Sequence, residues 1–134
     1  MSGQTYVDIL MEPGVLAHAA VIQGADGSMK VGGPSAASAG FRVSTGEAQT
    51  LANAFRNSSH VQSGGFQLAG VHYEVVRADA RSIYGKQRGP EGGGVIAVKT
   101  DKVFLIGTYD KSEQHETAAS VVESLADPLI SQGE

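Results

Sequence analysis

The 134-residue chain contains no cysteine, and this absence excludes several kinds of site at once. Without thiols there is no disulfide framework, no thiolate metal site and no cysteine nucleophile, which is compatible with a reducing compartment. The sequence also lacks a run of 18 apolar residues and the basic start and apolar segment of a signal peptide. We therefore expect a soluble protein of the cytoplasm.

Positive charge is scarce overall, because the net charge is -4 and the sequence pI is about 5.5. Affinity for nucleic acid comes from clustered Lys and Arg that neutralise phosphates, so a general nucleic-acid binder is not expected. Only local basic patches remain as sites for anions.

Catalytic and metal-binding motifs are missing as well. There is no Gly-x-Ser-x-Gly elbow, and the glycine run at 89–94 leads into a strand rather than a phosphate-binding helix, so a hairpin loop is favoured. The four histidines, His18, His60, His72 and His115, form no close ligand pair. We expect no enzyme, no metal and no cofactor, although a small-molecule sensor or enzyme using the glycine-rich loop is retained as an alternative without a motif in its favour.

Glycine is abundant instead, and its 18 residues fall between apolar runs, which indicates tight reversals. The strand-like runs are 15–23 with 28–31 as one hairpin, then 66–68, 71–77, 81–86, 95–100 and 102–109. Helices are predicted after Ser2, stopping at Pro13-Gly14, after a capping box at Ser44 and Glu47, and after Ser112. The pattern predicts one α+β domain over residues 1–134, with a central antiparallel β-sheet of about six to seven strands.

Seven of the ten basic residues lie in the strand-rich stretch 77–111: Arg77, Arg81, Lys86, Arg88, Lys99, Lys102 and Lys111. Alternation along paired strands would bring several of them onto one sheet face. A solvated face and a surface for an acidic partner are both consistent with this pattern, and the sequence alone leaves the two readings open.

Several segments resemble the profilin family, and the resemblance is strongest to profilins of amoeboid protists. The matching segments are Met1 to Asp8, Ala19 to Gly27, Gly65 to Tyr73, Arg77 to Lys86, Gly94 to Thr100 and Thr117 to Asp127, in the family's order. The resemblance implies terminal helices on one sheet face, short helices on the other, and a monomer.

The resemblance further implies a one-to-one complex with monomeric actin, regulation of actin polymerisation and promotion of nucleotide exchange on actin. Its actin-binding surface, carried over by position, comprises His72, Glu74, Arg77, Arg81, Lys86, Lys99, His115, Ala118, Ala119 and Glu123. Ser124 stands where close relatives carry a lysine. The alternative is a profilin-fold adaptor that does not bind actin, since function resides in sites rather than folds.

The resemblance also concerns two further ligands, proline-rich peptides and phosphoinositides. The aromatic groove for proline-rich peptides retains Tyr6, whereas the expected rings are replaced at Gly3, Lys30, Pro128 and Glu134, so poly-proline binding is expected to be weakened or absent. Pro128 also predicts that the last helix ends or kinks at Asp127. Phosphoinositide binding, in competition with actin, would use Arg77, Arg81, Lys86 and Arg88.

Overall fold

The computed structural model describes residues 3–23, 36–38, 40–57, 59–79, 81–87, 92–111 and 114–132. Its centre is an antiparallel seven-stranded sheet in the order β2-β1-β7-β6-β5-β4-β3. The strands are β1 His18–Gln23, β2 Ala36–Ala37, β3 Phe66–Leu68, β4 Val71–Ala78, β5 Ser82–Lys86, β6 Gly94–Lys99 and β7 Val103–Tyr109. The helices are α1 Gly3–Met11, α2 Thr45–Arg56, α3 Ser59–Gly64 and α4 His115–Ser131.

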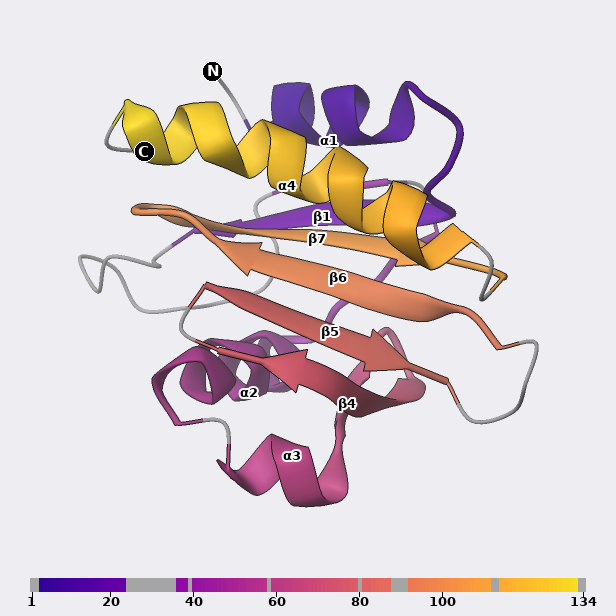
Figure 1. Ribbon diagram of the computed structural model, residues 1–134, viewed down its shortest axis with the longest axis vertical. Helices are drawn as coiled ribbons and strands as arrows, with labels where there is room; N and C mark the ends of the chain where they lie inside the picture. Colours follow the sequence, from indigo (N-terminus) through magenta and orange to yellow (C-terminus); the bar gives the residue numbers. More distant parts are fainter. Residues whose placement is uncertain are drawn as a thin grey trace.

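The helices cover the sheet in two layers, α1 with α4 on one face and α2 with α3 on the other (Figure 1). β7 lies between the layers and is buried along its whole length. Leu105 packs in the cluster under α1 and α4, whereas Phe104 packs in the cluster on the α2 side, as the alternation of a strand requires. The predicted α+β fold, with terminal helices on one face, is confirmed.

The capping box predicted at Ser44 and Glu47 opens α2. The Ser44 hydroxyl accepts the Glu47 amide N–H at 3.1 Å, and a Glu47 carboxylate oxygen accepts the Ser44 amide N–H at 3.0 Å. The same carboxylate accepts the amide N–H groups of Ala69 (3.0 Å) and Gly70 (3.1 Å) in the turn between β3 and β4. One side chain therefore caps a helix and also fastens a hairpin to it.

Two elements differ from the sequence-based expectation. The predicted hairpin partner of β1 at 28–31 lies outside the described residues, and Ala36 and Ala37 pair with Val21 and Ala20. The residue pattern did not predict the helix α3, although the family resemblance implied short helices on the face opposite the terminal helices. This helix is six residues long and buries Val61, so it carries no apolar periodicity that a sequence reading could detect.

The last helix was predicted to end or kink at Asp127, and the ending is wrong, because α4 continues through Pro128 to Ser131. A kink at Asp127 stays a prediction. Ser124 and Pro128 are both exposed, so the carbonyl that lacks a Pro128 N–H partner lies on the solvent side of the helix. Ala126 and Leu129 are buried against the sheet side and hold the last turn in place. The expected cap Ser112 lies outside the described residues, and Gln114 stands at the N-cap position.

Candidate functional site

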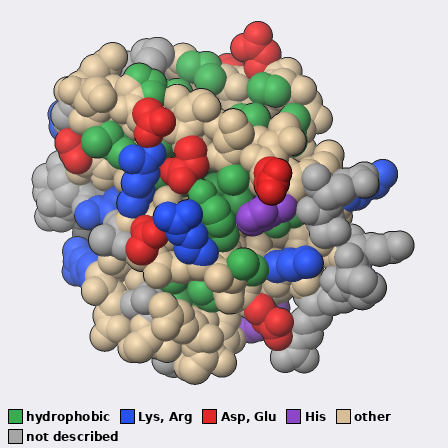
Figure 2. Space-filling view, in the orientation of Figure 1, with side chains coloured by type: hydrophobic (Ala, Val, Ile, Leu, Met, Phe, Trp, Pro, Cys, Tyr) green, Lys and Arg blue, Asp and Glu red, His purple; other side chains and the backbone are tan. Residues whose placement is uncertain are grey.

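Beside α4 the outer face of β4 is left open, because α4 packs on β6 and β7 and reaches only as far as β5. We call this surface the α4–β5 face and define it by Arg77, Asp79, Arg81, Ser82, Tyr84, His115, Glu123 and Asp127. Figure 2 shows basic and acidic side chains alternating here, next to hydrophobic and histidine side chains.

Arg81 joins the strand layer to the helix. Its Nε lies 3.4 Å from Oε1 of Glu123, and its terminal guanidinium nitrogen donates a hydrogen bond to the Asp127 carboxylate. The pKa of Arg81 is raised above its usual value, first by the hydrogen bond to Asp127 and then by the charges of Glu123 and Asp127. Arg81 is thus held as a cation between two carboxylates one helical turn apart.

Glu123 faces β5 rather than solvent, and its side chain is 25% exposed. Its carboxylate accepts the Tyr84 hydroxyl at 2.8 Å and the Ser82 hydroxyl at 3.3 Å. Burial, followed by the hydrogen bond and charge of Glu123, raises the pKa of Tyr84 to about 12. The Tyr84 phenol therefore remains a neutral donor at physiological pH.

Asp79 shapes the loop between β4 and β5. Oδ1 of Asp79 accepts the amide N–H groups of Arg81 and Ser82, each at 2.8 Å, while Oδ2 accepts Nε of Arg77 at 3.1 Å. The amide N–H of Ser82 is the main cause of the lowered pKa of Asp79, with the Arg81 amide and the Arg77 side chain adding to it. The Arg77 guanidinium carbon lies 5.4 Å from the centroid of the Tyr84 ring, within cation–π range.

Aromatic rings complete the face at the start of α4. The His115 ring meets Tyr84 and Tyr109 edge-on, with centroids 5.5 Å and 5.6 Å away. The Tyr109 hydroxyl lies 2.7 Å from Nδ1 of His115, at hydrogen-bond distance. Burial raises the pKa of Tyr109. These contacts fix the His115 ring against the strands.

A β-bulge adds a residue that the sequence analysis missed. The pairing of β4 with β5 shifts between Val75 and Arg77, and the extra residue, Val76, is 61% exposed. Val76 is one of two exposed large hydrophobic residues in the described parts of the chain, the other being Ile9. Sequence alternation could not locate it, because a bulge displaces one residue from the period of two.

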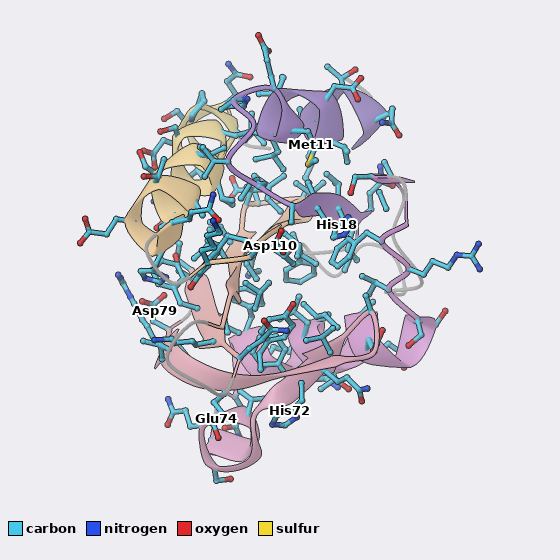
Figure 3. All side chains as sticks on the ribbon, turned by 90° about the vertical axis from the view of Figure 1, so that its right-hand side faces the viewer. Met11, His18, His72, Glu74, Asp79 and Asp110 are labelled. Carbon is cyan, nitrogen blue, oxygen red and sulfur yellow. The ribbon has the colours of Figure 1, made fainter. Side chains whose placement is uncertain are left out.

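Most of the predicted strand residues share this side of the sheet. The register opposes Glu74 to Lys86, and alternation places His72 on the same side. Figure 3 shows His72 and Glu74 together at the β3–β4 edge of the sheet. Lys99 differs, because it opposes Phe104 and so lies on the α2 side of the sheet.

The residues of α4 that were predicted for the actin-binding surface differ in their exposure to solvent. His115 and Glu123 join the contacts described above, and Ala119 is half-buried. Ala118 is 0% exposed and belongs to the core under α4.

The predicted lipid and proline sites are described in part. Arg77 and Arg81 already carry carboxylate partners, and Arg88 lies outside the described residues. Tyr6 is 6% exposed, so its ring packs in the core between α1, α4 and the sheet. Gly3 begins α1 and Pro128 is exposed on α4, whereas Lys30 and Glu134 lie outside the described residues.

A cavity that the described residues form away from the α4–β5 face is small. A cavity of about 230 Å³ lies near His18, Phe41, Tyr73 and Asp110, which is below the roughly 300–1,000 Å³ typical of small-molecule sites. No three His, Asp or Glu side chains of the described residues gather as metal ligands would. None of the described helices is both long enough and apolar enough to span a membrane.

Comparison with known proteins gives consistent matches over the whole chain. The family model described as Profilin matches residues 1–134. Profilin-1B and Profilin-2 of Acanthamoeba castellanii are 51% and 50% identical to it over 134 residues, covering 99% of each sequence. The resemblance predicted from the sequence motifs is confirmed.

Solved structures show the same likeness in three dimensions. Acanthamoeba castellanii profilin IB gives a TM-score of 0.86 at 49% identity, covering 99% of this chain and 100% of that one. Mouse profilin IIa, in complex with a double repeat from the FH1 domain of mDia1, gives a TM-score of 0.77 at 22% identity, covering 98% of both chains.

Proposed function

This chain belongs to the profilin family, and from that membership we propose that it binds monomeric actin through the α4–β5 face and regulates actin polymerisation. The complex is one-to-one, the protein is monomeric, and binding promotes nucleotide exchange on actin in the cytoplasm. The family is one of actin-binding regulators of the cytoskeleton, which is the basis of the proposal.

One observation supports the proposal above the others. Arg81 of the β4–β5 loop and Glu123 of α4, 42 positions apart in sequence, are joined into one continuous surface. Arg77 and His115, both predicted for the actin-binding site, contact Tyr84 at the centre of that surface. An exposed apolar residue, Val76, lies next to Arg77, and interfaces commonly combine such an apolar contact with charged surroundings.

Charge reversal at the edge of this face tests the proposal. Lys86 lies on the same side of β5 as Ser82 and Tyr84, so Lys86→Glu is expected to weaken actin binding at least about tenfold by opposing an acidic partner. The measurement is inhibition of pyrene-actin polymerisation at increasing protein concentration. The matched control is Arg42→Glu, which makes the same charge change at an exposed position next to Phe41 on the α2 side.

The outcomes distinguish actin binding from the alternative, a profilin-fold adaptor that does not bind actin. If the wild-type chain in excess does not sequester actin, the actin proposal is wrong and the adaptor function takes its place. If Lys86→Glu and Arg42→Glu weaken binding equally, the contact surface lies elsewhere on the molecule. Release of a fluorescent ATP analogue from actin, with and without the chain, measures the proposed promotion of nucleotide exchange.

We also propose that poly-proline binding is weakened in this chain. Where α1 and α4 meet, Tyr6 is buried and positions 3 and 128 are a glycine and a proline, so flat rings for stacking on a polyproline helix are lacking among the described residues there. An octaproline peptide should bind wild type more weakly than a Gly3→Trp, Pro128→Tyr variant, as measured by calorimetry. Micromolar binding by the wild type, equal to that of the variant, contradicts the proposal.

Phosphoinositide binding stays a prediction. Arg77 and Arg81 would have to exchange carboxylate partners for a phosphorylated headgroup, so any such binding should compete with actin.

A further inference from the structure

The basic residues of the α4–β5 face are already paired with acidic residues of the same molecule. Arg77 lies 3.1 Å from Asp79, and Arg81 is bracketed by Glu123 and Asp127. An acidic partner that approaches this face therefore meets ion pairs rather than unpaired cations. Electrostatic attraction between the two surfaces is reduced accordingly.

The two carboxylates that hold Arg81 are not equivalent. Glu123 also accepts the hydroxyls of Tyr84 and Ser82 and is 25% exposed, so it is part of the packing between α4 and β5. The Asp127 side chain is 65% exposed, and among the described residues its carboxylate has one side-chain partner, Arg81. Removing the Asp127 charge should therefore leave the fold intact, whereas removing Glu123 should not.

We propose that Asp127 sets the affinity of this face by competing with an actin carboxylate for the Arg81 guanidinium. The inference rests on the proposed function, since it concerns the same site. When actin binds, Arg81 exchanges Asp127 for the partner's carboxylate, while Glu123 keeps Arg81 positioned on β5. Asp127 then also lies near the incoming negative charge and repels it.

Magnitudes favour this exchange. An exposed ion pair such as Arg81 with Asp127 stabilises the molecule little, whereas a charge pair desolvated in an interface contributes more. The partner can therefore displace Asp127. The exchange weakens actin binding by the free energy that the ion pair between Arg81 and Asp127 contributed. We expect Asp127→Asn to tighten actin binding about two- to fivefold.

The test measures the dissociation constant for monomeric actin over a range of salt concentrations. Asp127→Asn is compared with Asp8→Asn, which makes the same charge change on the exposed side of α1. Asp127→Asn should bind more tightly and show a steeper salt dependence, while Asp8→Asn should behave as wild type. In an Arg81→Gln background, Asp127→Asn should bring no gain.

Each outcome decides the question. Equal affinities of Asp127→Asn and Asp8→Asn would overturn the inference, and so would a gain that persists in the Arg81→Gln background. The rate at which phenylglyoxal modifies Arg81, followed by mass spectrometry without actin, should rise in Asp127→Asn, and an unchanged rate would show that Asp127 does not shield Arg81. Failure of the wild type to bind actin refutes the proposed function itself, and the inference with it.

Discussion

At the scale of single residues, carboxylates rather than arginines organise the α4–β5 face. Asp79 accepts two backbone N–H groups of the β4–β5 loop as well as the Arg77 side chain. Glu123 accepts hydroxyls from β5 and contacts Arg81. These carboxylates hold the arginine side chains in place. Protonating one of them should therefore move the arginines as well as change the charge of the face.

Asp79 gives a prediction about acid stability. Its folded pKa lies below its ordinary value, so its ionised form stabilises the fold at all pH values above the ordinary pKa near 4, and this contribution is lost as pH falls through the lower folded pKa. Asp79→Asn should therefore be less stable than wild type at pH 7 and should lose less further stability between pH 5 and pH 3. Urea unfolding followed by circular dichroism at each pH measures this. Parallel pH profiles of the two proteins would contradict it.

At the scale of elements, the sequence predicted what is local and missed what depends on distant partners. The strands between Phe66 and Tyr109 match the prediction within one or two residues, because each is paired with its neighbour along the chain. The helix cap at Ser44 was also predicted correctly, because its contacts with Glu47 are local in sequence. The predicted end of the helix at Pro128 was wrong, because burial of Leu129, a tertiary contact, outweighs the local penalty.

The candidate site shows the same division. Alternation predicted that several cations share one sheet face, and the pairing register places Arg77 and Lys86 on one side of the sheet and Lys99 on the other. Arg77 reaches that side because of the bulge at Val76, which alternation could not predict. The pairing of Arg81 with Glu123 and Asp127 could not be predicted, because strand periodicity says nothing about where α4 crosses. Two of the cations that make this stretch basic in sequence, Arg77 and Arg81, are therefore paired with carboxylates of the same molecule in the structure.

Glu47 gives the prediction at this scale, because it joins α2 to the β3–β4 hairpin. Ser44→Ala removes one helix cap and should lower the free energy of unfolding by about 1 kcal/mol. Glu47→Ala removes the reciprocal cap and the acceptor of the Ala69 and Gly70 amides, and should cost about 2 kcal/mol. Equilibrium urea unfolding measures both. Equal losses would show that the hairpin contacts contribute nothing measurable.

At the scale of the whole molecule, one sheet serves two cores. Tyr73 packs in the core on the α2 side, whereas Tyr84 packs in the core under α1 and α4. β7 contributes side chains to both cores, and each core lacks a second sheet of its own. The two layers should therefore unfold as one cooperative unit.

Alkaline unfolding tests whether the two layers unfold together. The pKa of Tyr73 and the pKa of Tyr84 are each raised to about 12, and burial is the largest cause in both cases. The unfolded chain ionises near pH 10, so stability is fully present below that pH and is lost as pH rises toward 12. The chain has no tryptophan, so absorbance at 295 nm reports tyrosinate directly, and it should rise in one step that coincides with the loss of circular dichroism. Tyr84→Phe and Tyr73→Phe should each lose less stability than wild type between pH 9 and pH 11. Two separate absorbance steps, one removed by each variant, would mean that the layers unfold independently.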